Sequence, residues 1–600
     1  MAEKEIKKRS QTDKKYHWRI EDLYHDTESW QKDFDRVKIM SQELSAYEGT
    51  LTKSAKILLE FLEKKDQTGK LLEAIYVYAN QKYHEDTSVS EFQRLSDLAA
   101  GLMSHYSSAI SFVEPELLEL SEELLEAFEK EEQGLQKYHR FFQEIFRHRE
   151  HTCSKEIETL LAQTTELAET ASNIFSMFNN ADITFPEIED EDGQLCRITH
   201  ARYMNFMQSS NRRVRKDAFL GLYHIYQKFK NTLGATFIGN LKKDAFYAKI
   251  RKYSSSLAMA LDDANIPEVV YHTLIQTVHN HMDAMYQYLS LRKEVLHVEE
   301  LHFYDIYVPM MPDFKKTVCF EDAKELVKKA LEPLGEEYGK VLLEGFHNGW
   351  IDVYENEGKR SGAYSWGAYG THPFVLLNYQ DQLNDVFTLA HEMGHALHSW
   401  FSDKTQPYCY AGYKIFVAEV ASTCNEALLM DYLLKHCVDK KERAYLINYF
   451  LEQFRTTLYR QTMFAEFELK THEWQEQGKG VTADRLCKLY LELNQLYFGK
   501  EVVMDEEIAM EWARIPHFYN SYYVYQYATG YAAAIALSRR ILKEGECAVK
   551  DYLRFLQGGS SKDPIDLLRD AGVDMTSERP IEEALKFFEE LIGQYRECLP

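Results

Sequence analysis

The segment 384–400 constrains the fold and the chemistry of this chain more than any other. It reads as an amphipathic helix that contains the pentapeptide His391-Glu392-Met393-Gly394-His395. Four residues turn an α-helix by about 400°, so the two histidines stand about 40° apart, one turn above the other. This spacing predicts that both imidazoles bind one metal ion, for which zinc is the typical choice.

Glu392 lies about 100° from His391 around the same helix, beside the expected metal rather than on it. A carboxylate there can take a proton from water, so we predict a general base, and a peptidase is the first hypothesis. We expect Asn384 or Asp385 to cap the start of the helix. The opposite face is expected to pack against the protein, because it carries the apolar residues Val386, Leu389, Met393, Leu397 and Trp400.

A catalytic zinc ion usually takes three protein ligands and leaves the fourth position to water. The metzincin pattern would place glycine at position 398 and histidine at position 401, whereas this chain has His398 and Phe401. Three ligands from one straight helix would leave a poor tetrahedron, so we expect His398 to support a ligand or to pack rather than to bind metal. The third ligand must come from another segment.

The segment 414–430 reads as a mostly apolar helix that carries two carboxylates, Glu419 and Glu426, seven residues apart. Both project from nearly the same face, and a carboxylate in apolar surroundings is costly unless it is paired or binds metal. Seven residues span about 10.5 Å of helix, so we do not expect both carboxylates to bind one ion. One is expected to bind the metal and the other to orient a histidine.

The stretch from His391 to His398, followed by Phe416-Val-Ala-Glu419-Val-Ala-Ser422, resembles the thimet oligopeptidase family of zinc peptidases, and most closely its bacterial oligoendopeptidase F branch. The resemblance implies that Glu419 is the third zinc ligand and that Glu426 lies near the zinc-binding histidines. It covers roughly residues 200–590. It implies a mainly α, zincin-type (gluzincin) fold with a small β-sheet near the zinc helix and a deep channel for unfolded oligopeptides.

A second segment, 514–531, is rich in tyrosine and resembles the part of the family that faces the substrate opposite the zinc. Hydrolysis needs a donor for the oxyanion that forms on the peptide carbonyl, and a neutral tyrosine hydroxyl can supply it. We assign this role to Tyr525, with His517 and Tyr522 as further candidates for contacts to the substrate or transition state. Tyr519 can exchange roles with Tyr522, because this loop does not align with the family without a gap. Alone, such a cluster would also fit an aromatic core.

The glycine-rich, aromatic stretch 358–378 ends in a strand-like run and reads as the edge of a sheet. In the resembling family a strand before the zinc helix binds the extended substrate through its backbone, which predicts the same role here. The alternative is an edge strand that the protein itself covers.

With 600 residues, the chain is long enough for more than one core. Amphipathic spacing predicts helices within 55–64, 117–130 and 157–178, and the stretch 182–200 reads as a β-hairpin. We therefore predict an N-terminal helical region, 1–190, and a catalytic zinc peptidase region, 191–600.

The composition argues against several classes of partner. The net charge of -25 and the lack of a basic stripe exclude a nucleic-acid surface. No apolar run approaches the length of a membrane span, and the charged N-terminus lacks the apolar core of a secretion signal. The nine cysteines include no Cys-x-x-Cys pair, which favours a reducing compartment. We expect a cytoplasmic protein without a membrane or nucleic-acid partner.

The predicted function is a zinc-dependent endopeptidase with one Zn2+ per chain, held by His391, His395 and Glu419, that acts on short unfolded oligopeptides. One alternative is an exopeptidase of the carboxypeptidase type with the same zinc chemistry. Another is a peptide-binding protein with a structural metal, although a structural site needs no base such as Glu392. The sequence predicts neither the oligomeric state nor the residue preference at the cleaved bond.

Overall fold

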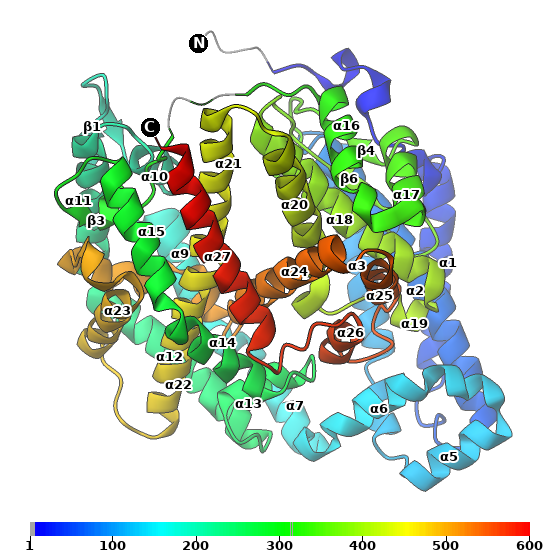
Figure 1. Ribbon diagram of the computed structural model, residues 1–600. Coiled ribbons are helices and arrows are strands. Elements are labelled where there is room, and N and C mark those ends of the chain that lie inside the picture. Colours follow the sequence, from blue (N-terminus) through cyan, green and yellow to red (C-terminus); the bar gives the residue numbers. More distant parts are fainter. Residues whose placement is uncertain (1–5, 312–313, 315, 600) are drawn as a thin grey trace. The chain divides into compact units, whose positions relative to one another are not determined.

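Helices make up most of the chain, as the amphipathic spacing predicts (Figure 1). The computed structural model describes residues 6–311, 314 and 316–599. The strands within these residues are short, with two or three residues each. The predicted mainly α fold class is thus confirmed.

The described chain forms two compact units, and each is assembled from three separate segments. Unit 1 takes residues 1–149, 315–429 and 537–572, and unit 2 takes residues 150–314, 430–536 and 573–600. Two of the boundaries fall inside the helices α20 (Ile415–His436) and α24 (Tyr525–Glu544). The division near residue 190 into a helical and a catalytic region stays a prediction.

Unit 1 contains both the first helices of the chain and the helix with the pentapeptide. Ser54 begins the longest of the early helices, because its hydroxyl accepts a hydrogen bond from the N–H of Ile57. The predicted helix at 55–64 is the first part of this α2. The main helices are α1 (Thr27–Ser45), α2 (Ala55–Glu85), α3 (Ser90–Ala109), α5 (Glu122–Glu131), α6 (His139–Arg147), α16 (Phe320–Ala330), α17 (Gly335–His347), α18 (Leu383–Thr405), α25 (Glu546–Leu556) and α26 (Pro564–Asp570).

A three-stranded sheet precedes α18, in the order β4 (Ile351–Asp352), β6 (Phe374–Leu376), β5 (Tyr364–Trp366). β4 runs parallel to β6, and β5 runs antiparallel to it. β6 is buried and central, so the strand directly before α18 is not an edge, contrary to the sequence-based expectation for this stretch. The half-buried edge strand of the stretch 358–378 is β5.

The N-terminal segment packs against this sheet within unit 1. Phe374 of β6 shares one hydrophobic cluster with Trp18 and with residues of α1 to α3. The backbone N–H of Val353 donates to the carbonyl of Tyr16 at 2.9 Å. Arg9 donates to the buried Asp352 at 2.6 Å. The start of the chain therefore contributes directly to the core of the unit that carries the pentapeptide.

Unit 2 is built from the remaining helices and from two small strand pairs. β1 (Glu187–Glu189) and β2 (Leu195–Arg197) pair antiparallel, which confirms the hairpin predicted at 182–200. The helix predicted at 157–178 is instead three short helices, α7 (Lys155–Gln163), α8 (Thr165–Ala168) and α9 (Thr170–Met177). The longer helices are α11 (Arg212–Lys228), α12 (Lys230–Ile250), α14 (Glu268–Asn280), α15 (Met282–Val295), α21 (Lys440–Gln453), α22 (Arg460–Glu476), α23 (Ala483–Phe498) and α27 (Arg579–Cys598).

Candidate metal centre and active site

The helix α18 holds the pentapeptide much as its periodicity predicts. Its expected apolar face is buried: the exposed fraction is 0% for Val386, Leu389, Met393 and Leu397, and Trp400 is half-buried. The cap differs from the prediction, because the N-cap residue is Gln382. Asp385, in the first turn, accepts hydrogen bonds from the N–H groups of Gln380 and Gln382, each at 2.9 Å.

Gly394 lets α18 approach α20 closely. A Cβ atom on Gly394 would lie 2.5 Å from the Cα of Ser422 and 2.8 Å from the carbonyl oxygen of Ala421. Both are backbone atoms, which cannot rotate away as a side chain can. The fourth residue of the pentapeptide is therefore glycine because the next helix occupies the space of any side chain.

This close approach brings His391 and His395 of α18 together with Glu419 of α20. One carboxylate oxygen, Oε2 of Glu419, lies 3.3 Å from Nε2 of His391 and 3.4 Å from Nε2 of His395. The ligand atoms of the three residues lie within 4.8 Å of one another, a group that could hold a metal ion. Burial opposes ionisation of Glu419, but the two histidines outweigh it and hold its pKa below the usual range.

The spacing of these atoms fits a shared zinc ion. Ligand atoms bound about 2.0–2.1 Å from one tetrahedral ion stand about 3.3–3.4 Å apart. A charge-assisted hydrogen bond between the same groups would be about 2.7–2.9 Å long. The distances of 3.3 and 3.4 Å match the first arrangement, and two imidazoles with one carboxylate form a donor set typical of catalytic zinc.

Glu426 lies two turns further along α20 and orients His391. Its Oε1 lies 2.6 Å from Nδ1 of His391. When this carboxylate accepts the Nδ1 proton, Nε2, the atom that faces Glu419, is the nitrogen left to bind a metal. Two acids seven residues apart thus contact the same imidazole from its two sides.

Glu392 is buried beside the two histidines, with an exposed fraction of 7%. Its Oε2 atom has no hydrogen-bond partner among the residues that the structure describes. Burial raises the pKa of Glu392, and the charges of His391 and His395 oppose this shift only in part. The group is therefore a carboxylate with a raised proton affinity and a free acceptor atom.

Two further residues near the cluster show what sequence reasoning found and missed. His398 stacks on Tyr413 at 3.8 Å between ring centroids and is not part of the candidate metal group. Ser422, to which the sequence motif assigned no role, donates its hydroxyl to Oε2 of Glu419 at 3.1 Å and so steadies that carboxylate. The spacing of Glu419 and Ser422 could have predicted this hydrogen bond, because residues three apart lie on the same face of a helix.

The tyrosine-rich segment, 514–531, belongs to unit 2. His517 and Tyr519 lie in the short helix η12 (Pro516–Tyr519), and Tyr525 begins α24. Tyr522 and Tyr525 are each 3% exposed, and both rings contact Tyr271 of α14, with centroid distances of 5.6 and 5.1 Å.

The protonation of this segment follows from burial. Burial raises the pKa of Tyr525 and of Tyr522, so both phenols keep their protons at neutral pH. The side chain of His517 is exposed to solvent overall, but part of its ring is buried, which lowers its pKa. The roles assigned to these residues stay predictions.

Comparison with known proteins identifies the family. The model of peptidase family M3 matches residues 205–587, and the model described as oligopeptidase F matches residues 116–185. The chain belongs to peptidase family M3. The resemblance read from the pentapeptide and from Glu419 is thereby confirmed, and membership makes the chain a metalloendopeptidase that acts on oligopeptides.

The relatives match over nearly the whole chain. Oligopeptidase PepF of Bacillus subtilis (strain 168) is 49% identical over 97% of this chain and 87% of its own length. The crystal structure of oligoendopeptidase-F from Enterococcus faecium is 37% identical, with a TM-score of 0.74 over 95% of this chain and 99% of that one. A Chlamydophila abortus structure, provisionally described as a peptidase, is 36% identical with a TM-score of 0.94, over 99% and 100%.

The helices of the described residues were also compared with the requirements of a membrane span. None of these helices is both long enough and apolar enough to cross a bilayer.

Proposed function

We propose that this chain is a zinc-dependent endopeptidase that hydrolyses internal bonds of short, unfolded oligopeptides. His391, His395 and Glu419 hold one Zn2+ per chain. The observation that carries the proposal is the pair of distances, 3.3 and 3.4 Å, between one oxygen of Glu419 and the two Nε2 atoms. The names of the relatives support the substrate class.

Zinc bound there supplies a Lewis acid, which lowers the pKa of a water molecule toward about 7 and polarises the scissile carbonyl. Glu392 takes a proton from the attacking water and afterwards delivers it to the departing amine. The raised pKa of Glu392 suits a group that must both accept and release a proton near neutral pH. Glu426 keeps the Nδ1 proton of His391 in place, so that Nε2 stays a ligand.

Tyr525 donates its O–H to the oxyanion that forms on the substrate carbonyl. His517 and Tyr522 contribute contacts to the substrate or the transition state, and Tyr519 is the alternative to Tyr522. The support for these roles is the family resemblance of the segment and the burial of Tyr525, which raises its pKa and preserves the donor proton.

The substrate backbone binds along the edge strand β5 (Tyr364–Trp366) by hydrogen bonds of the β-sheet kind. Such bonds join backbone groups and do not depend on the side chains of the substrate, which suits peptides of varied sequence. The proposal further includes a deep channel that admits unfolded peptides and a cytoplasmic location, as the family resemblance and the cysteine usage predict.

A peptide blocked at both ends tests the function. Mass spectrometry of the products, with and without a chelator, should show cleavage at internal bonds that stops on chelation and resumes when Zn2+ is added. An exopeptidase would leave the blocked peptide intact while trimming its unblocked form. A scaffold protein would bind zinc with four protein ligands and cleave neither peptide.

A further inference from the structure

Tyr522 has a backbone conformation that a bulky residue rarely adopts. Its φ angle is +59°, in the left-handed region that favours glycine. Such strain persists only where the surrounding structure fixes the residue, and it is typical of functional segments. The question is therefore which groups of unit 2 hold Tyr522 in this conformation.

The carboxyl group of Glu468, on α22, accepts a hydrogen bond from the backbone of Tyr522. The N–H of Tyr522 donates to Oε1 of Glu468 at 2.9 Å, and Glu468 is 0% exposed. Burial raises the pKa of Glu468 well above its usual range, and the hydrogen bond from Tyr522 opposes this shift only in part. Burial thus favours the neutral carboxyl group, and its Oε1 is the acceptor for the Tyr522 N–H.

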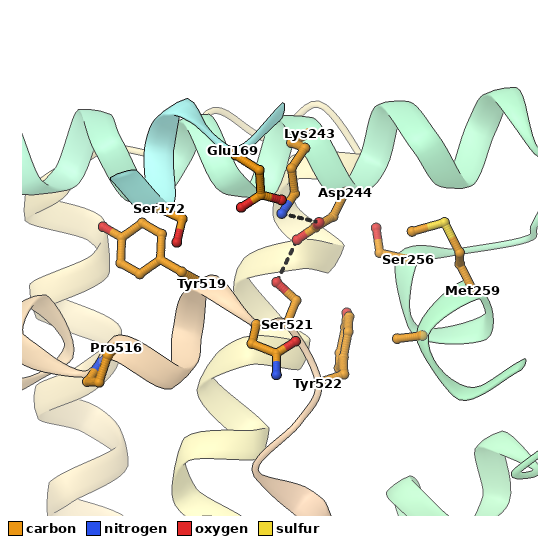
Figure 2. A pocket seen from close by; sticks show the side chains of 12 residues that line it. Glu169, Ser172, Lys243, Asp244, Ser256, Met259, Pro516, Tyr519, Ser521 and Tyr522 are labelled. Carbon is orange, nitrogen blue, oxygen red and sulfur yellow. Dashed lines mark hydrogen bonds and ion pairs between the residues drawn. The ribbon is translucent and has the colours of Figure 1, made fainter. Parts of the chain in front are cut away.

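A second acid, Asp244 of α12, holds the preceding residue (Figure 2). The hydroxyl of Ser521 donates to Oδ2 of Asp244 at 2.6 Å, and Nε2 of His472 lies 3.1 Å from the same oxygen. Nδ1 of His472 faces the carbonyl oxygen of Glu468 at 2.8 Å, so both ring nitrogens face acceptors. Burial opposes ionisation of Asp244, but His472 and the other donors outweigh it and lower its pKa.

The segment 519–522 depends on its hydrogen bonds to Glu468 and Asp244, because one side of it faces a cavity. Tyr519, Ser521 and Tyr522 line a cavity of about 420 Å³ together with Asp244 (Figure 2). The other side packs, since the ring of Tyr522 contacts Tyr271 and His472. Tyr525 contacts the same Tyr271 ring. Fixing the backbone at Tyr522 therefore helps to hold the phenol rings of Tyr522 and Tyr525 against the ring of Tyr271.

We propose that Glu468, assisted by Asp244, is a positioning residue of the peptidase: the two acids hold the strained segment that presents Tyr522 and Tyr525. The proposal rests on the proposed function, in which these phenols contact the reacting groups. It predicts that loss of the acceptor at position 468 misplaces the phenols without removing them, and such misplacement lowers kcat more than it changes KM.

The test compares three variants of the full-length, zinc-loaded enzyme. Glu468→Leu removes the acceptor, and kcat should fall by about 10- to 100-fold with little change in KM or zinc content. Glu468→Gln keeps a carbonyl acceptor of the same shape as the neutral acid, so it should restore kcat to near the parent value. Glu466→Gln is the matched control, because it changes a buried acid of α22 that bonds His279, Lys470 and Tyr497 rather than the loop. It should lower Tm but not kcat.

The outcomes separate this proposal from the proposed function. If Tyr525→Phe lowers kcat while Glu468→Leu, although less stable, keeps the parent kcat, Glu468 is merely structural and the positioning proposal fails alone. If Tyr525→Phe has the parent kcat, the oxyanion role itself fails. Should Glu468→Leu not fold, Ser521→Ala tests the second anchor at a half-buried position. It should lower kcat by about three- to tenfold, and an unchanged kcat would overturn the proposal.

Discussion

Substitution of Gly394 by alanine should weaken the metal site without changing any ligand. The new Cβ would lie 2.5 Å from the Cα of Ser422, and an ordinary contact begins near 3.4 Å, so the two helices must separate by about 0.9 Å. Glu419 lies one turn before Ser422 on the same helix and would move with it. Metal–ligand distances tolerate only about 0.2 Å, so zinc affinity should fall by about 10- to 100-fold.

The assay measures zinc affinity by competition with a chromophoric chelator, alongside peptide hydrolysis and Tm. Gly339→Ala is the matched control, because Gly339 is a helical glycine of unit 1 whose added Cβ would meet nothing within 4 Å. This control should retain zinc and activity, and its Tm should not fall. If Gly394→Ala bound zinc and cleaved peptide as the parent does, the close helix contact would not set the ligand geometry.

Three further predictions concern single acids of unit 1. Glu392→Gln should keep its zinc and lose about 100- to 10,000-fold in kcat, and near-normal hydrolysis at full zinc occupancy would refute the base assignment. Glu419→Ala should lose zinc far more readily than Glu426→Ala in a chelator titration, and the reverse order would exchange the two roles. Burial and the charge of Glu73 raise the pKa of Asp403 to about 7, from a usual value of 3.8. The folded state therefore keeps a proton that the unfolded chain releases, and the free energy of unfolding should decrease as the pH rises from about 4 to about 7. Asp403→Asn should flatten this decrease in thermal unfolding scans at pH 5 and pH 8, and an unchanged pH dependence would contradict the assignment.

The sequence predicted the structure best where the spacing of residues within one helix was sufficient. The 3.6-residue period placed His391, His395 and the buried apolar face of α18 correctly, because local spacing alone decides which residues share a face. The pairing of Glu419 and Glu426 with one imidazole followed from the cost of burying two carboxylates on an apolar helix.

Features set by distant segments were harder to predict. β6 pairs with residues 351 and 352, more than twenty positions upstream, and a strand of two residues leaves no readable alternation, so its central place was missed. The reason for Gly394 lies in another helix, at Ser422. The anchors of the tyrosine segment lie 54 and 277 positions away, at Glu468 and Asp244, where no local pattern marks them.

X-ray absorption at the zinc edge tests the central claim most directly. For the purified enzyme, the account predicts two imidazole nitrogens and one or two oxygens at about 2.0–2.2 Å, with no sulfur at about 2.3 Å. Glu419→Ala should lose an oxygen from this shell, whereas Glu392→Gln should leave the shell unchanged. A sulfur ligand, or a shell that Glu419→Ala does not alter, would contradict the proposal that His391, His395 and Glu419 share one ion.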